Sequence, residues 1–449
     1  MPPPPVYPPV SPEGDASAAP TLAEASRVWA RIGLLSFGGP AGQIALMHRE
    51  LIDARGWIAE DRFLGLLNFA MLLPGPEAQQ LATAIGWQMH GVKGGLVAGT
   101  LFILPGFVAI LALSLLYVTV GQVPLVEGLF LGLRAAVIAI VLTAIVRLGR
   151  RVLGQRALLA IAVAAFVAIG IVGLPFPLVL LAAAALGAFL GRGGGLAAPG
   201  HGGGGTPATL ATGAAVRSTA GVSLVLALLW AGTVAALWLA LGGGHVFTAI
   251  ATFFSKLALV TFGGAYAVLA WVTQEAVGTH GWLSTPEMVD GLALAETTPG
   301  PLILVIQFVA FLAGARAETG LPPLLAGTLA SLIAVWVTFL PCFLWIFAGA
   351  PHADRLLSSA RLSGALAAIT AAVVGVIAAL ALWFALNSLF AELRPVPGLA
   401  IPIPRWESLR WPAAAIAAAA TFAALRWKPS TPLLLAGCAA AGLVAGLRP

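Results

Sequence analysis

The sequence predicts an all-α polytopic membrane protein built from two homologous halves. Of its 449 residues, 60% are hydrophobic and only 9% are charged, whereas about a quarter of the residues of a typical soluble domain are charged. The 17 acidic and 23 basic residues are too few to cover a soluble protein of this length, and exposed apolar patches cause association. Motifs of rare residues also return at a fixed spacing. The composition argues against a soluble enzyme and a secreted domain. It also argues against a nucleic-acid binder, because the basic residues are scattered between apolar segments.

Charge-free stretches long enough to cross a membrane recur along the chain. A helix needs about 20 residues to cross a hydrocarbon core of ~30 Å. Counting these stretches and the turns inside them predicts about 10 to 13 membrane segments. The candidates are residues 26–47, 62–88, 94–118, 125–147, 156–173, 175–191, 218–242, 246–274, 287–314, 321–349, 362–390, 411–426 and 430–447.

Two stretches of unusual composition divide the chain. Residues 1–25 are Pro-rich, with no basic region before an apolar core, so they predict a disordered tail rather than a signal peptide. Residues 191–217 are Gly-rich and predict a flexible linker. The predicted units are therefore a first transporter repeat at 26–190, a connecting membrane segment at 218–245 and a second repeat at 246–449.

Three motifs occur in both halves and in the same order. They are Phe37-Gly38-Gly39 with Phe262-Gly263-Gly264, Pro74-Gly75-Pro76 with Pro299-Gly300-Pro301, and Leu104-Pro105 with Leu340-Pro341. The first two pairs are 225 residues apart and the third is 236 apart, which implies an insertion of about eleven residues in the second half. The chain is therefore a tandem duplication.

The charges predict that the two repeats have opposite orientations. The basic loop at 147–156 and the linker should lie in the cytoplasm. Seven predicted segments then separate the two Phe-Gly-Gly motifs, and an odd number inverts the second copy. Gly-Gly-Pro and Pro-Gly-Pro interrupt an α-helix, and such interruptions are tolerated in lipid only where protein or a water-filled cavity satisfies the backbone. Inverted repeats with broken helices at the bilayer midplane are typical of secondary transporters.

At these motifs the sequence resembles the chromate ion transporter family in its long two-domain form. The resemblance rests on Ser36-Phe37-Gly38-Gly39-Pro40, Leu73-Pro74-Gly75-Pro76 with Gln79-Gln80-Leu81-Ala82, Leu104-Pro105-Gly106, Thr261-Phe262-Gly263-Gly264-Ala265-Tyr266, residues 291–301 and Gln307-Phe308. It implies a bacterial inner-membrane permease that exports chromate, confers chromate resistance and is driven by the membrane potential or the proton gradient. Ala265 stands where the first half has Pro40, so the two half-sites differ.

Two carboxylates lie inside predicted membrane segments, Glu77 and Glu296. A charged side chain at the bilayer centre costs about 2.5–3.5 kcal/mol on insertion scales, which marks it as a candidate functional residue. Both are predicted proton carriers. The alternative for Glu77 is a cap on the helix that follows Pro76, where the helix dipole favours an acid.

A dianion needs positive charge or many N–H donors, and a guanidinium group suits oxyanions. Arg134 lies deepest among the basic residues, and its alternative role is an ion pair with Glu127. Lys256, the second candidate, could instead extend toward the membrane interface. The predicted substrate-binding set is Arg134, Lys256, Phe37, Gly38, Gly39, Pro74, Gly75, Pro76, Gln79, Gln80, Phe262, Gly263, Gly264, Thr298, Pro299, Gly300 and Pro301.

The remaining motifs predict neither a metal nor a cofactor. The two cysteines, Cys342 and Cys438, have no CxxC partner, and the histidines lack metal-binding spacing. The expected partners are chromate or a sulfate-like oxyanion, protons and the lipid bilayer, with no nucleic acid, and a homodimer stays open. Sulfate matches chromate in charge and shape and is the main alternative substrate. An intramembrane enzyme and a passive channel are the alternatives outside the transporters.

Overall fold

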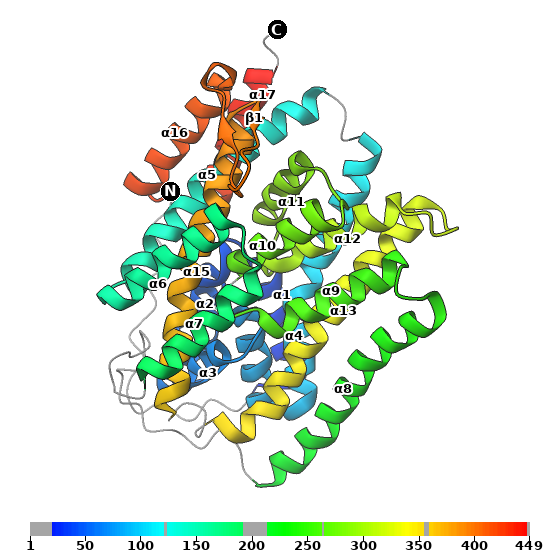
Figure 1. Cartoon of the computed structure of the whole chain (residues 1–449). Helices are drawn as coiled ribbons and strands as arrows, with labels where there is room; N and C mark the ends of the chain where they lie inside the picture. The colour runs from blue at the N-terminus through cyan, green and yellow to red at the C-terminus, as the bar shows by residue number, and fades with distance from the viewer. Residues whose placement is uncertain (1–19, 121–123, 192–212, 263–264, 354–358, 447–449) are drawn as a thin grey trace.

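The computed structural model describes residues 20–120, 124–191, 213–262, 265–353 and 359–446, and most of these residues are helical (Figure 1). Most of the predicted tail and of the predicted linker lie outside these residues, as do Gly263 and Gly264. The first half contains α1 (Leu22–Leu34), α2 (Gly39–His48), η1 (Arg49–Asp53), α3 (Glu60–Leu72), α4 (Glu77–Val120), α5 (Pro124–Val152), α6 (Arg156–Phe166), η2 (Val167–Val172) and α7 (Phe176–Gly191). Helix α8 (Gly213–Leu241) follows, in the place of the predicted connecting segment.

The second half repeats this order with one addition, a short β-hairpin between two helices. Its elements are α9 (Val246–Val260), α10 (Ala265–Thr273), η3 (Gln274–Thr279), α11 (Thr285–Thr297), η4 (Leu302–Leu304), α12 (Val305–Arg316), α13 (Pro323–Gly349), η5 (Ala350–His352), α15 (Ala360–Leu389), β1 (Leu393–Arg394), β2 (Ile403–Pro404), η6 (Trp406–Ser408), α16 (Trp411–Arg426) and α17 (Thr431–Gly446). The strands pair antiparallel, with Leu393 opposite Pro404 and Arg394 opposite Ile403.

Helix α1 begins at Leu22, inside the stretch predicted as a tail, so that boundary was placed too late. Thr21 and Glu24 form a capping box there, in which the Thr21 side chain accepts from the Glu24 N–H and Glu24 accepts from the Thr21 N–H. Hydrogen bonds from the Thr21 backbone and hydroxyl groups lower the pKa of Glu24. The two residues satisfy orphan donors of the first turn, which is the usual signal for a helix start.

Among the described residues, five helical stretches are long and apolar enough to cross a membrane. They are Glu77–Thr119, Glu127–Val152, Thr219–Leu241, Pro323–Gly349 and Arg361–Leu389. These stretches confirm the prediction of a helical polytopic membrane protein. The first is interrupted at His90 and Gly91, whose backbone angles are not helical, so it contains two helical parts.

The core lies around the second half. Helix α12 is buried from Val305 to Gly314, and most of the apolar stretches of α13 and α15 are buried against other helices. Helix α8 lies at the opposite extreme, because only 6% of its apolar stretch is buried. It packs on α13 and α9 along one side and presents Leu224, Leu228 and Leu239 outward, as a lipid-facing helix does.

The spacing of the helices confirms the two-half architecture. Helices α3 and α11 begin 225 residues apart, at Glu60 and Thr285, and α5 and α15 begin 236 apart, at Pro124 and Ala360. Helices α6 and α7 correspond in order to α16 and α17, because both pairs begin 255 residues apart. Two insertions explain these steps. One lies near residues 317–327, around the start of α13, and the other contains the β-hairpin.

The two halves run in opposite directions. In Figure 1, the part of α4 after Gly91 rises from the lower part of the molecule toward the top, whereas its counterpart α13 descends. Helix α15 likewise rises toward the β-hairpin, whereas α5 begins at the top. The direction of these pairs is that of an inverted repeat.

The inverted arrangement predicts that Ala54 and Thr279, which are exposed and 225 residues apart, face opposite sides of the membrane. Single cysteines at these positions, in a Cys342→Ala, Cys438→Ala background, should differ in intact cells. An impermeant maleimide should label only one of them, and permeabilised cells should show labelling of both. Labelling of both cysteines in intact cells would contradict the inverted topology.

Each half covers the long helix of the other half. Helices α6 and α7 pack on α15, and α16 and α17 pack on α5. Glycine pairs bring these helices into backbone contact. A Cβ atom on Gly187 of α7 would lie 2.3 Å from the Gly364 carbonyl oxygen of α15, and one on Gly442 of α17 would lie 2.4 Å from the Gly128 carbonyl oxygen of α5. The same small-residue contact is thus made twice, which is a common way to associate helices in membranes.

Candidate functional site

The candidate site lies where four helix breaks meet. Helices α1, α3 and α11 each have 13 residues, or about 20 Å at 1.5 Å per residue, and so end short of a ~30 Å hydrocarbon core. The breaks after them contain glycines with left-handed backbone angles, at φ 86° for Gly38, 138° for Gly75 and 93° for Gly300. An L side chain rarely adopts these angles, so glycine is required where the chain changes direction.

Two reciprocal hydrogen bonds join the breaks of one half to those of the other. The Gly75 N–H donates to the Thr261 carbonyl oxygen at 2.7 Å, and the Gly300 N–H donates to the Ser36 carbonyl oxygen at 2.9 Å. These pairs are equivalent under the 225-residue repeat. The Pro-Gly-Pro motif of each half therefore satisfies the backbone that the Phe-Gly-Gly motif of the other half leaves unpaired.

The Leu-Pro motifs complete the same crossing. A Cβ atom on Gly106 would lie 2.3 Å from the Pro299 carbonyl oxygen, so α4 approaches the second Pro-Gly-Pro break at backbone distance. The residue equivalent to Gly106 in the second half is Cys342, and its Sγ atom would lie 3.0 Å from a Cβ atom on Gly75. The third repeated motif thus lies against the second one, across the two halves.

Buried glutamines satisfy carbonyl groups at this crossing. Gln43 Nε2 donates to the Gly300 carbonyl oxygen at 2.6 Å, Gln80 Nε2 to that of Pro74 at 2.8 Å and Gln307 Nε2 to that of Phe107 at 2.9 Å. Gln79 Nε2 instead donates to Thr83 Oγ1 at 3.0 Å. Three of these side chains support the backbone, one of the two roles weighed for the polar residues near the breaks.

Other polar atoms at the crossing remain available. Within the described part of the chain, five buried side-chain oxygens near the breaks have no hydrogen-bond partner. They are Ser36 Oγ, Gln79 Oε1, Gln80 Oε1, Gln307 Oε1 and Thr338 Oγ1. Each residue is at most 1% exposed. Buried polar groups are normally paired, so these atoms are candidates for contact with water or a transported ion, and the two hydroxyl groups can donate to an anion.

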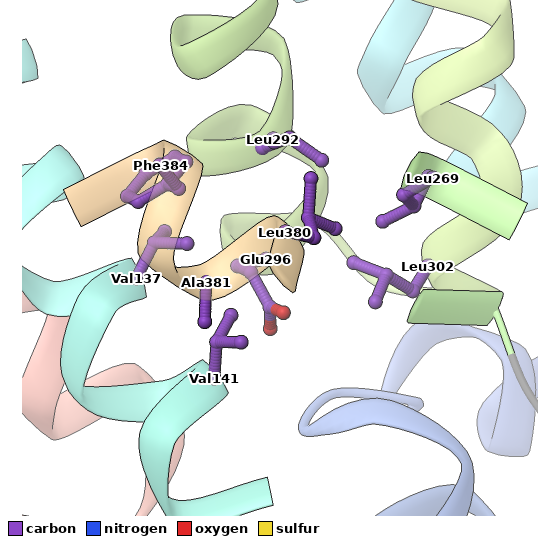
Figure 2. A pocket seen from close by; sticks show the side chains of 9 residues that line it. All are labelled: Val137, Val141, Leu269, Leu292, Glu296, Leu302, Leu380, Ala381 and Phe384. Carbon is purple, nitrogen blue, oxygen red and sulfur yellow. The ribbon is translucent and has the colours of Figure 1, made fainter. Parts of the chain in front are cut away.

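Glu296 points into a small apolar cavity beside the crossing. Its residue is 4% exposed, and its carboxylate lies among Val141, Ala381 and Leu302 in Figure 2. The cavity holds about 10 Å³, enough for about one water molecule. Apolar residues of α5, α10, α11, η4 and α15 line the rest of it, namely Val137, Leu269, Leu292, Leu380 and Phe384.

Glu77 occupies a different position. It is the first residue of α4, directly after Pro76, and is half-buried. This position agrees with the alternative role of a helix-start acid. The two acids are not repeat equivalents, because Leu302 stands 225 residues after Glu77 and Met71 stands 225 residues before Glu296. The carboxylates therefore break the symmetry of the duplication.

Arg134 is ion-paired with a residue of the other half. Its Nε atom lies 2.6 Å from Asp290 Oδ1, and Tyr117 donates its hydroxyl to Asp290 Oδ2 at 2.9 Å. The alternative pairing with Glu127 is wrong, because Glu127 lies exposed at the start of α5. Asp290 was missed although it lies within the predicted segment 287–314. The argument that selected Glu296 there, an acid inside a membrane segment, would also have found it.

The other basic candidates lie on exposed helix faces. Lys256 is exposed on α9, five residues before Thr261. Its repeat equivalent Arg31 is 61% exposed and lies 3.8 Å from Glu50. Of the remaining predicted substrate-binding residues that the structure describes, Phe37, Gly38, Gly39, Pro74, Phe262 and Pro299 are half-buried, and Gly75, Pro76, Gln79, Gln80, Thr298, Gly300 and Pro301 are buried.

The two ends of the repeats differ in closure. A hollow of about 630 Å³ lies at the end of α9 and α12, and its lining includes His245, His280 and Arg316. Arg316 and His245 correspond under the repeat to Gly91 and Pro20, at the equivalent end of the first half. There the His90 ring lies 2.6 Å from the Pro20 carbonyl oxygen and joins α4 to the start of α1.

A family model described as "Chromate transporter" matches residues 23–188 and 248–443. The chain is similar to a chromate transport protein of Pseudomonas aeruginosa, at 36% identity over 78% of this chain and 77% of the relative. It is 29% identical to a chromate transport protein of Cupriavidus metallidurans over 96% of both chains. It is 26% identical to a probable chromate transport protein of Synechococcus elongatus, over 86% of this chain and 90% of the relative. No solved structure matches the chain significantly.

Proposed function

Because the chain belongs to the chromate transporter family, we propose that it exports chromate across the inner membrane and confers chromate resistance. The proton gradient or the membrane potential supplies the energy. The observation that carries this proposal is the crossing of four broken helices, held by the reciprocal Gly75–Thr261 and Gly300–Ser36 hydrogen bonds. Inverted repeats that meet at such breaks are the architecture of secondary transporters.

The crossing has the chemistry of an oxyanion site. Helices α2 and α4 begin at the breaks, and helix starts present backbone N–H groups and positive dipole ends. Ser36 and Thr338 add unpaired hydroxyl groups. We assign the binding of chromate to these groups together with the predicted set of Phe-Gly-Gly, Pro-Gly-Pro and glutamine residues. The open hollow at one end and the closed contact at the other support alternating access.

Inside-out membrane vesicles test this function. Vesicles that contain the protein should accumulate labelled chromate when they are energised, because their cytoplasmic face points outward. Vesicles without the protein should not. Excess sulfate should reduce the uptake if the two dianions share the site. Accumulation of labelled sulfate without uptake of chromate would identify the alternative substrate, and downhill movement alone would indicate a channel.

Replacement of Glu296 by glutamine should abolish the stimulation of chromate transport by an imposed proton gradient. The amide has nearly the same shape but cannot carry a proton, and an apolar cavity favours the neutral form of an acid. The measurement is the initial uptake rate into vesicles with and without the gradient. Glu77→Gln provides the comparison, because Glu77 occupies a helix start. A Glu296→Gln variant that still responds to the gradient would exclude Glu296 as a proton carrier.

A further inference from the structure

A charge cluster joins the two halves away from the crossing. It consists of Arg134 of α5, Asp290 of α11 and Tyr117 of α4, and both carboxylate oxygens of Asp290 are bonded, one to Arg134 Nε and the other to the Tyr117 hydroxyl. The Asp290 side chain is only 5% exposed, and that of Arg134 is 23% exposed. Asp290 is therefore held at fixed distance from a cation that is itself partly accessible.

The guanidinium group of Arg134 keeps donors in reserve. Within the described residues, Asp290 is its hydrogen-bond acceptor and receives only the Nε–H group. The two terminal nitrogens have no acceptor there, and they are not fully buried. Asp290 thus fixes the orientation of the guanidinium plane and leaves the terminal N–H groups free to bind two oxygens of an oxyanion.

Further charged groups surround this pair. Glu287 lies one turn before Asp290 on α11 and is ion-paired with Arg316 of α12. Arg410 lies near Arg134, because partial burial and then the Arg134 charge lower the pKa of Arg410. Helix α15, which also packs on α11, contains a single charged residue, Arg361, in its first turn. The three arginines near Asp290 thus face two carboxylates.

The duplication does not repeat this cluster. Gly65 stands 225 residues before Asp290, and Thr370 stands 236 residues after Arg134. Thr370 donates its hydroxyl to the Leu366 carbonyl oxygen of its own helix. A contact needed only to fasten the two halves would be expected on both sides of the pseudo-symmetric molecule, as the glycine pairs are. A cluster present once is better suited to a directional step.

We propose that Asp290 takes up a proton when an oxyanion binds to Arg134. A dianion at the terminal N–H groups brings negative charge close to the Asp290 carboxylate, and like charges in a site of low dielectric repel strongly. A proton from water forms an O–H bond on Asp290, which removes this repulsion and leaves the Arg134 charge to the anion. The partly exposed start of α11, around Glu287, is the nearest polar surface. The proposal rests on the proposed transport of oxyanions and names the residue that links it to protons.

The test is the pH dependence of chromate affinity, measured on the purified full-length protein in lipid nanodiscs at mildly alkaline pH, where chromate is a dianion. The wild-type dissociation constant should fall as the pH falls, by up to tenfold per pH unit for one linked proton. Asp290→Asn should bind chromate more tightly than wild type at the highest pH, and its affinity should change little with pH. Glu287→Gln is the matched control, because it removes a carboxylate of the same helix, and it should keep the wild-type slope.

A second measurement does not depend on a variant that folds. Adding chromate to wild-type protein in weakly buffered solution should remove about one proton per bound anion, as read by a pH indicator. Binding without proton uptake, or an unchanged slope in Asp290→Asn, would overturn this inference and leave the proposed function intact. Wild-type protein that binds no chromate would instead contradict the proposed function. The exchanged pair Arg134→Asp, Asp290→Arg separates a structural role, since full recovery of transport would show that only the ion pair matters.

Discussion

Replacement of Gly106 by valine should abolish chromate transport. A Cβ atom at this position would lie 2.3 Å from the Pro299 carbonyl oxygen and 2.6 Å from a methyl group of Leu304. Overpacking a well-packed core typically costs about 1–3 kcal/mol and sometimes more. Here the obstacle is the backbone of a helix break, which cannot move aside as a flexible side chain can. We expect the transport rate to fall by more than about 100-fold, because α4 must move away from the crossing.

The measurement is the initial rate of chromate uptake into vesicles, normalised to the amount of protein in the membrane. Gly65→Ala is the matched control, because Gly65 lies within α3 and no atom lies within 4 Å of its added Cβ. This control should transport at the wild-type rate. If Gly106→Val also transports at the wild-type rate, the close approach of α4 to the second Pro-Gly-Pro break is not needed for function.

The duplication and its breaks could be predicted because their signals are local. Gly and Pro interrupt helices through their own backbone chemistry, so Pro74-Gly75-Pro76 and its copy mark breaks wherever the chain goes. Apolar stretches likewise predict membrane helices from length alone. The structure confirms the helical membrane fold and the two-half architecture that these signals predict.

The partners across the crossing could not be predicted in the same way. The sequence shows that Gly75 and Gly300 are equivalent, but the bond from Gly75 to Thr261 joins residues far apart in the chain. The match between α6–α7 and α16–α17 was also hidden, because a second insertion moves the repeat spacing to 255 residues. Which helices pack together depends on the whole set of packed surfaces, and no single segment carries that information.

Arg134 shows the same limit at the candidate site. Its depth and the geometry of its guanidinium group make it a candidate for oxyanion binding from the sequence alone. The nearest acid along the helix, Glu127, was the natural partner to consider, since residues a few turns apart share a helix face. The true partner, Asp290, is 156 residues away and belongs to the other half. Its discovery changes how Arg134 must be tested.

Loss of the Arg134 side chain should remove most chromate binding. Truncating one member of a charged pair at a binding site costs about 2–5 kcal/mol, which corresponds to a loss of affinity of about 30-fold to 4,000-fold. Arg134→Lys keeps the charge but loses the planar group and its Nε–H bond to Asp290, so we expect a smaller loss. The measurement is the chromate dissociation constant of the purified protein, together with the concentration of sulfate that halves chromate binding.

Arg134→Ala alone is ambiguous, because it leaves Asp290 buried without its cation, and a stranded buried charge costs about 3–5 kcal/mol of stability. The double variant Arg134→Ala, Asp290→Asn removes both charges and so restores a neutral interior. If oxyanion binding needs the guanidinium group, this variant should insert normally and still bind chromate weakly. If it inserts normally and binds chromate with wild-type affinity, Arg134 is a structural partner of Asp290. Lys256, exposed on α9 near the second Phe-Gly-Gly break, would then be the next base to substitute.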